Sequence, residues 1–382
     1  MRFLLKAASK AASKTKSGCQ TQKALWFLFM IGYGSWSYAA DPYQLLRTDP
    51  TGYAEVKPNR EWRFPQDHQP HDEFRIEWWY LTANLNDENG NQYGIHWTLF
   101  RQSLDATPNP GGWPSNQVWM AHGAISTPTG HVYKQRFARG GIGQAGVKLN
   151  LDDRFEAWLD DWTWLGSSAS PLPGVLEFSV DDYKLSLSLN ASTPWVLQGE
   201  SGYSQKSATG QASYYYSQPH INITGLLTRN EAPAEASIKL TGKGWLDREW
   251  SSQPLAPDQP GWDWLSIHLD DGNALMIYRL RRTNGEDWYS GSWVNPEGIS
   301  ETLGPDDIRF EEIKRTSVQV SEGQSREMPL HWRVELPGKG LIWEIAPTSA
   351  EHWLNTAFPY WEGPVEVTGS TTGTGFLELT GY

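Results

Sequence analysis

The pattern of short apolar runs limits the fold of this chain more than any other feature. The runs alternate apolar with polar residues or are rich in β-branched and aromatic residues, and turn residues separate them at 87–90, 271–273 and 337–338. Apolar residues three and four apart, as an amphipathic helix requires, are scarce, and only 347–353 favours a short helix. The pattern predicts strands over 76–85, 93–100, 175–180, 184–189, 238–240, 274–280, 331–336 and 341–345. We therefore expect an all-β fold of antiparallel strands, built as barrels or a sandwich.

Two motifs occur twice along the chain. Segment 78–101 resembles 262–281, because each opens with aromatic residues at i and i+2, passes through a turn and ends in arginine. Segment 241–247 resembles 372–378, with the shared pattern Thr-Gly-x-Gly-aromatic-Leu-acid. A proline-rich stretch at 252–261 lies between the two halves. The repeat predicts two related domains at 42–252 and 261–382; the alternative is coincidence in a chain rich in tryptophan and glycine.

Residues 1–39 differ in composition from the rest of the chain. They hold six basic residues and no acidic one, then an apolar run at 24–38, and small residues at Ser37 and Ala39. This order is typical of a secretory signal peptide, and the apolar run is shorter than the roughly 20 residues of a membrane span. We expect export to the periplasm or the medium; the alternative is an uncleaved membrane anchor.

Charge and cysteine content narrow the class of protein. The chain has 44 acidic and 32 basic residues, and its net charge of −12 would repel nucleic acid. The one cysteine, Cys19, lies in the predicted leader, so no disulfide or thiol chemistry is expected after cleavage. The histidines are scattered without zinc-binding spacing, and nucleotide-binding glycine motifs are missing. We expect neither a metal nor an organic cofactor.

The densest polar cluster, at 245–250, supplies the first candidate residues. On a strand, Trp245, Asp247 and Glu249 share one face, and in a barrel such a face points either inward or outward. A carboxyl in a cavity lined by tryptophan would be desolvated, and its raised pKa would make it a proton donor. The alternative is a structural salt bridge with Arg248 or Arg101.

Three further residues are candidates because they lie among aromatic residues in predicted strands. Glu77 precedes an aromatic triplet, and His96 and His122 lie within strand segments. A lone strand histidine is often a hydrogen-bonded core residue, and this alternative stays open. Long polar segments at 103–117 and 198–219 read as loops that cover a site. Because both precede residue 252, we expect the cavity inside the first barrel.

Several longer motifs resemble a known family. They are Glu77-Trp78-Trp79-Tyr80, the segments 121–126, 247–253, 261–264 and 360–363, and the end of the chain at 379–382. These motifs look like those of the AttH-like/carotenoid 1,2-hydratase (CrtC) family, over about residue 45 to the end. The resemblance implies two lipocalin-like antiparallel β-barrel domains.

The same resemblance implies two possible roles. One branch of the family hydrates a terminal isoprenoid double bond without a cofactor, and Asp247 matches the essential aspartate of that branch. The other branch, described as lipocalin-like or as a predicted secreted hydrolase, often accompanies an ABC transporter permease complex. The Arg-Glu-Trp that follows Asp247 looks like this AttH branch, and no convincing match exists for the upstream histidine of the hydratases, although His220 lies nearby.

These observations combine into one expectation and one alternative. We expect an exported protein that binds a hydrophobic small molecule, an isoprenoid or a lipid, and hydrates or hydrolyses it. Asp247 would protonate the molecule, Trp245 would stabilise the resulting cation, and Glu77, His96 or His122 would orient water. The alternative is a non-catalytic lipid carrier or an accessory protein of an ABC transporter.

Overall fold

The computed structural model describes residues 41–229 and 237–382, and nearly all of their regular structure is antiparallel strand. The first sheet contains β1 (Ile76–Asn86), β2 (Gln92–Ser103), β3 (Gln117–Thr127), β4 (Gly130–Arg139), β5 (Ala145–Leu149), β6 (Phe155–Leu159), β7 (Trp162–Gly166), β8 (Gly174–Val180), β9 (Tyr183–Asn190), β10 (Val196–Leu197), β11 (Tyr203–Gln205), β12 (Ala212–Arg229) and β13 (Ile238–Ser251). The second sheet contains β14 (Trp262–Leu269), β15 (Ala274–Leu280), β16 (Trp288–Val294), β17 (Ser300–Leu303), β18 (Arg309–Ser321), β19 (Gln324–Leu336), β20 (Leu341–Pro347), β21 (Trp353–Leu354), β22 (Tyr360–Gly369) and β23 (Gly373–Thr380). Short 3-10 helices are η1 (Pro42–Arg47), η2 (Gln66–His68), η4 (Pro305–Asp307) and η5 (Pro337–Lys339).

The predicted all-β fold with two lipocalin-like antiparallel barrels is confirmed. Every predicted strand segment lies within a strand, and the predicted turns join β1 to β2, β14 to β15 and β19 to β20. Two local predictions are wrong. Residues 348–352 are not helical, because the chain leaves β20 at Pro347 and starts β21 at Trp353. The loop predicted at 198–219 includes β11 and the start of β12, since Tyr214, Tyr215 and Tyr216 pair with other strands.

The two sheets have corresponding strand orders, which is what the sequence repeat predicts. The first runs β4-β3-β2-β1-β13-β12-β9-β8-β7-β6-β5, and the second runs β17-β16-β15-β14-β23-β22-β20-β19-β18. In each, the opening strand pairs with both the second strand and the last strand. Trp78 in β1 and Trp262 in β14 therefore occupy equivalent strands. The predicted leader lies outside the described residues, and the domain limits at residues 252 and 261 stay a proposal, although the sheets change over between them.

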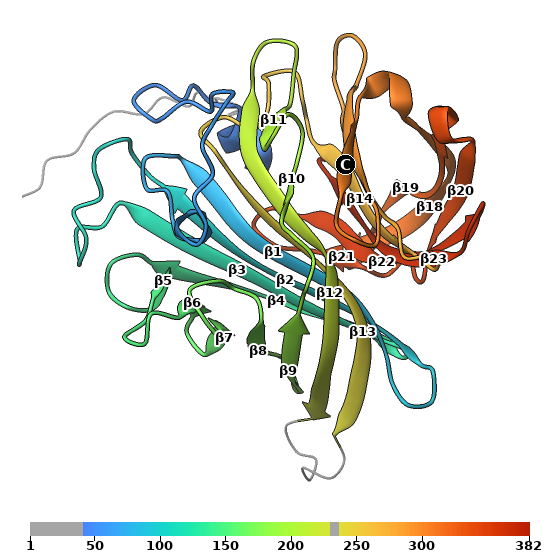
Figure 1. Cartoon of the computed structure of the whole chain (residues 1–382), viewed down its shortest axis with the longest axis horizontal. Helices are drawn as coiled ribbons and strands as arrows, with labels where there is room; N and C mark the ends of the chain where they lie inside the picture. Colours follow the sequence, from blue (N-terminus) through green and yellow to red (C-terminus); the bar gives the residue numbers. More distant parts are fainter. Residues whose placement is uncertain (1–40, 230–236) are drawn as a thin grey trace, which may run out of the picture. The chain divides into compact units, whose positions relative to one another are not determined.

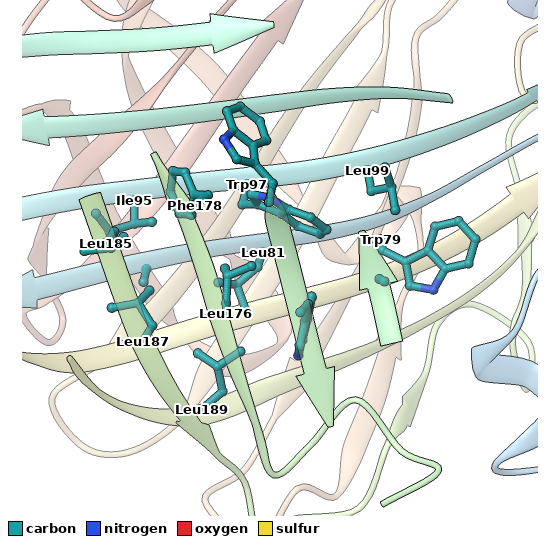
Figure 2. Packing of buried hydrophobic residues seen from close by; sticks show 14 of the residues in the cluster. Trp79, Leu81, Ile95, Trp97, Leu99, Leu176, Phe178, Leu185, Leu187 and Leu189 are labelled. Carbon is teal, nitrogen blue, oxygen red and sulfur yellow. The ribbon is translucent and has the colours of Figure 1, made fainter. Parts of the chain in front are cut away.

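The first sheet curls so that β6 and β8 contact β2, β3 and β4 across a filled interior (Figure 1). Alternate residues of β1 and β2 point into it, among them Trp79, Leu81 and Trp97. Figure 2 shows these side chains meeting leucines and Phe178 from the opposite strands. Because Trp97 and its neighbours are fully buried and close-packed, this interior is a core rather than a ligand cavity.

A second core fills the other sheet, and a third apolar layer lies between the sheets. The second core includes Trp332, Trp343 and Trp361. The third layer combines Tyr80 and Trp245 from the first sheet with residues of β14, β15 and β23. Among the described residues, no helix is long and apolar enough to span a membrane.

Candidate active site

The main cavity lies between the two sheets and not inside the first barrel, so the predicted location is wrong. Even-numbered residues of β1 and β2 face it, whereas their odd-numbered neighbours fill the barrel core. Side chains alternate along a strand, so each face of the first sheet serves a different layer. The cavity has a volume of about 170 Å³ and reaches the surface beside the half-exposed Phe137 of β4. Its wall includes Trp78, Tyr80, His96, Phe100, Met120, His122, Tyr215, Asp247, Glu249, Trp262, Trp264, Phe358, Tyr360, Glu362 and Glu378.

Asp247 is held in this wall by three donors from the first sheet. The hydroxyl of Tyr215 donates to Oδ2 at 2.7 Å, the hydroxyl of Ser217 donates to Oδ1, and the indole N–H of Trp245 donates to Oδ1 at 2.7 Å. Register explains the arrangement, because Ser217 on β12 and Tyr80 on β1 lie directly opposite Asp247 on β13. The predicted shared face of Trp245, Asp247 and Glu249 is thus present, but it faces the second sheet.

The environment of Asp247 places its protonation near neutrality. Burial raises its pKa to about 7, while the hydrogen bonds from Ser217, Tyr215 and Trp245 act in the opposite direction. Glu249 raises the pKa a little further. A carboxyl of this kind exchanges protons readily near pH 7, as general acid–base catalysis requires.

Glu362 brings a second carboxyl into the cavity from the other sheet. It lies on β22, and the Tyr80 hydroxyl donates to its Oε1 at 2.6 Å. Its Oε2 lies 3.2 Å from Nδ1 of His96. Burial and the neighbouring Glu378 raise the pKa of Glu362 well above its usual range, although the Tyr80 hydrogen bond acts against this. Burial also keeps the pKa of His96 well below its usual range, so the two groups meet as a neutral pair rather than as an ion pair.

Glu378 is the repeat partner of Asp247. It lies opposite Trp264 on β14 and opposite Glu362 on β22, as Asp247 lies opposite Tyr80 and Ser217. Burial raises the pKa of Glu378 to about 8, and the negative charge of Asp247 adds to that effect. The cavity is therefore bordered by two equivalent rows of side chains, one from each half of the chain.

His122 lines the cavity as predicted, in a neutral form. Burial lowers its pKa to about 3. The amide oxygen of Gln135 accepts from the backbone N–H of Ala357, so its amide nitrogen donates to Nε2 of His122 at 2.8 Å. Nδ1 then carries the hydrogen and donates to the Tyr360 hydroxyl at 2.7 Å. Tyr360 can in turn donate to a bound molecule.

A buried ion pair completes the polar part of the wall. Nζ of Lys206 lies 2.9 Å from Oε1 of Glu249 and 4.2 Å from the ring centre of Tyr278. Burial lowers the pKa of Lys206, but Glu249 and Tyr278 outweigh it, so the amine stays charged. This pair fixes one full charge of each sign beside Asp247.

Glu77 lies away from the cavity, and its predicted position near the site is wrong. It points to the opposite face of β1, where the guanidinium groups of Arg101 and Arg248 contact its two oxygens. The backbone N–H of His71 also donates to it at 2.9 Å. These cations hold its pKa well below the usual range against the effect of burial. The alternative of a structural salt bridge therefore applies to Glu77 rather than to Asp247.

Sequence reasoning missed three acidic or basic side chains of the wall, Glu378, Glu362 and Lys206. Glu378 could have been found, because the repeat aligns it with Asp247. Glu362 lies in one of the motifs that carry the family resemblance, but nothing in the sequence placed it beside Tyr80. Lys206 carries no sequence signal, since it comes from a polar segment at 206–211 between β11 and β12. His220 lies away from this group, bonded to the Asn295 carbonyl.

The fold and these motifs match known proteins. A crystal structure of a protein assigned to AttH from Nitrosomonas europaea is 33% identical, with a TM-score of 0.72, over 86% of this chain and 99% of that chain. Kievitone hydratase from Nectria haematococca has a TM-score of 0.62 at 14% identity, over 86% of this chain and 96% of its own. CghA, solved with Sch210972, has a TM-score of 0.53 at 15% identity, over 88% and 96%. The last two show a shared fold alone.

Comparison with curated proteins finds no match for this chain. The family model described as AttH-like matches residues 55–382, which include both sheets and the whole cavity wall from Ile76 onward. The chain therefore belongs to the AttH-like family.

Proposed function

We propose that this protein is an acid–base enzyme of the hydratase type. It would add water to a carbon–carbon double bond of an apolar molecule, or catalyse the reverse loss of water. The observation that carries the proposal is Asp247, a buried carboxyl with a pKa of about 7 in the wall of a mainly apolar cavity. Burial of a carboxyl lowers the stability of the fold. Buried carboxyls with strongly shifted pKa values are found most often at functional sites. A proton exchanged between Asp247 and the bound molecule would start or complete the reaction.

The aromatic rings of the wall suit the charge that such a reaction creates. Protonation of a substituted double bond leaves a carbocation, and the rings of Trp264 and Tyr80 line the cavity together with Asp247. The face of an aromatic ring stabilises a cation by about 2 kcal/mol or more when water is excluded. Trp245, predicted to stabilise the cation, would also act on the reaction through the hydrogen bond that its indole N–H donates to Asp247. The name of one fold relative, kievitone hydratase, agrees with this class of reaction.

The size of the cavity favours a substrate that enters by one end. Its 170 Å³ is close to the roughly 150 Å³ of an apolar cavity that holds benzene. A terminal isoprenoid unit would suit a space of this volume, and the rest of the molecule would leave past Phe137. Hydrolysis of a lipid at the same acids is compatible with the wall but has no separate observation in its favour.

The substitution Asp247→Asn tests the proposal, because it keeps the shape and removes the exchangeable proton. Kievitone and an acyclic carotenoid are suitable probes. Mass spectrometry identifies a hydrated product by the added mass of one water molecule, and a reaction in ¹⁸O-water should place the label in that product. The wild-type protein should hydrate at least one probe, and the variant should lose about 10²- to 10⁴-fold in kcat while its folding is retained. Glu88→Gln, on a side chain 75% exposed, is the matched control.

Retention of the probe distinguishes the remaining alternative. A carrier for an ABC transporter would bind an apolar molecule equally well with Asp or Asn at 247 and would never change its mass. Lipids that copurify with the protein, identified by mass spectrometry, name the ligand in either case. We also propose that residues 1–39 direct export, and N-terminal sequencing of the mature protein tests this.

A further inference from the structure

The cavity contains two candidate proton-transfer groups on opposite sheets, and their hydrogen bonds differ in kind. Asp247 accepts from Trp245, whose indole N–H can only donate, and from the hydroxyls of Tyr215 and Ser217. The Tyr215 oxygen itself lies 3.3 Å from the indole nitrogen of Trp264, which is also a donor. All three side chains that hydrogen-bond this carboxyl are donors, and hydrogen bonds to the charged form favour that form.

The surroundings of Glu362 suit the neutral acid instead. One donor, the Tyr80 hydroxyl, reaches Oε1. Oε2 and Nδ1 of His96 lie 3.2 Å apart, and within the described residues neither atom has another hydrogen-bond partner. Nε2 of His96 lies 2.6 Å from the Thr98 hydroxyl, so it can carry the imidazole hydrogen and leave Nδ1 as an acceptor. A proton on Oε2 satisfies both orphan atoms at once.

We infer that Glu362 donates the proton to the double bond and that Asp247, as a carboxylate, accepts the proton of the attacking water. This inference rests on the proposed hydratase function and reverses the role expected for Asp247 from its sequence. Sites that perform acid and base chemistry commonly hold two titratable groups whose environments push their pKa values apart.

The reaction balances with water as the only co-reactant. The O–H bond of Glu362 breaks and a C–H bond forms, which leaves a cation at the neighbouring carbon. A water oxygen bonds to that carbon, and its released proton goes to Asp247. A proton then passes from Asp247 to Glu362 through solvent, so both groups return to their starting states. Tyr80 is the positioning residue, since it bonds Glu362 and lies opposite Asp247 in the strand register.

The charged and titratable neighbours of both groups support opposite states. Asp247 faces Tyr80 and Tyr215, and Glu249 and Glu378 lie beside it. Lys206 forms an ion pair with Glu249. Glu362 faces Tyr80 and His96 from the first sheet and Tyr360 and Glu378 from its own sheet. No cation stands within ion-pair distance of Glu362 among the described residues, since His96 is kept neutral by burial.

Infrared titration of the full chain tests the order of ionisation without any ligand. The C=O band of a protonated carboxyl is followed with rising pH in the wild type, Asp247→Asn, Glu362→Gln and the control Glu88→Gln. The band lost in Asp247→Asn should disappear near pH 7, and the band lost in Glu362→Gln should persist to higher pH. If the Glu362 band ionises first, or is never present at pH 7, the inference is wrong.

The conservative variant Tyr80→Phe keeps the test valid if Glu362→Gln fails to fold. Removal of the hydroxyl that stabilises ionised Glu362 should move the Glu362 band to higher pH. The Asp247 band, whose hydrogen bonds come from other residues, should stay near pH 7. A Tyr80→Phe spectrum with no shift in the higher-pH band would contradict the inference.

The pH profile of turnover then assigns the roles, once a hydrated probe is known. With Asp247 as base, kcat should rise about tenfold per pH unit below pH 7 and level off above it. With Asp247 as acid, kcat should instead fall as the pH passes 7. If the enzyme is active but kcat falls as the pH passes 7, the inference is wrong and the proposed function stands. If no probe is turned over although the infrared titration shows Asp247 ionising before Glu362, the result counts against the proposed function alone.

Discussion

At the scale of single residues, burial and the neighbouring side chains decide whether each carboxyl is a fixed anion or an exchangeable acid. Glu77, Asp247 and Glu362 are all buried beside aromatic rings. Two arginines compensate Glu77, neutral donors surround Asp247, and Glu362 meets a neutral imidazole. The same side chain is therefore a structural anion in one place and an exchangeable acid in another. Counting acids beside tryptophans in the sequence does not separate these cases.

The substitution Glu77→Gln should lower the free energy of unfolding by about 3–5 kcal/mol, because it leaves Arg101 and Arg248 buried without their counter-charge. Since the folded-state pKa of Glu77 is depressed, its stabilisation is complete above its ordinary value of 4.5 and disappears as the pH falls below that value. Urea denaturation at neutral pH measures the effect. Glu344→Gln, in a pair whose side chains are 60% and 46% exposed, should change stability by less than about 0.5 kcal/mol. Equal effects for both variants would contradict this account.

At the scale of elements, one glycine shows how the first barrel closes. Gly123 lies on β3, and a Cβ placed there would come within 2.9 Å of Trp162 and 3.1 Å of Phe178. Those rings belong to β7 and β8, which approach β3 from across the interior. The absent side chain thus gives room for the two rings that complete the core. The neighbouring His122 points to the other face and into the cavity.

The substitution Gly123→Ala should therefore destabilise the protein by about 1–3 kcal/mol through overpacking. Gly130→Ala, at the start of the adjacent β4, is the matched control, because nothing lies within 4 Å of a Cβ added there. Thermal unfolding followed by near-ultraviolet circular dichroism of the tryptophans reports the difference. A variant Gly123→Ala as stable as Gly130→Ala would show that β3 and β7 can separate without cost.

At the scale of the whole molecule, buried histidines and buried carboxyls have opposite effects on how the free energy of unfolding depends on pH. Burial lowers the pKa of a set of histidines to about 3 or 4: His68, His122, His131, His268 and His352. Between those values and 6.5 the unfolded chain binds more protons, so stability rises with pH over that range. Asp247 and Glu378 have raised pKa values of about 7 and 8, so the stability that they contribute at low pH is lost as the pH rises from their ordinary values of 3.8 and 4.5 to these values.

The free energy of unfolding should therefore have its maximum near pH 6.5 and fall on both sides. Urea titrations from pH 4 to 9 test the expectation, with a change of more than about 2 kcal/mol on the acid side because several histidines act together. Asp247→Asn should steepen the rise on the acid side, because wild-type Asp247 loses its contribution between pH 3.8 and about 7, and should leave the decline between pH 7 and 8, to which Glu378 contributes, unchanged. A stability profile that is flat between pH 4 and pH 8 would show that these histidines are not buried in the neutral form.

The sequence by itself determined the strands, the repeat and the sharing of faces. Alternation is a local property, so the strands were predictable, and a period of two already put Trp245, Asp247 and Glu249 on one side of β13. The repeat also aligned Asp247 with Glu378 before any contact was known, and the family motifs predicted the two barrels.

Only the tertiary structure decided which layer each face meets. Periodicity cannot say whether a barrel core or a second sheet covers a given face, because that depends on contacts between residues far apart in the chain. The Tyr80 hydroxyl and Glu362 lie 282 positions apart and meet at 2.6 Å. The cavity therefore lies between the sheets and not, as predicted, inside the first barrel. Its wall includes Glu362 and not Glu77, because the packing of the two halves, and not the local pattern, brings these side chains together.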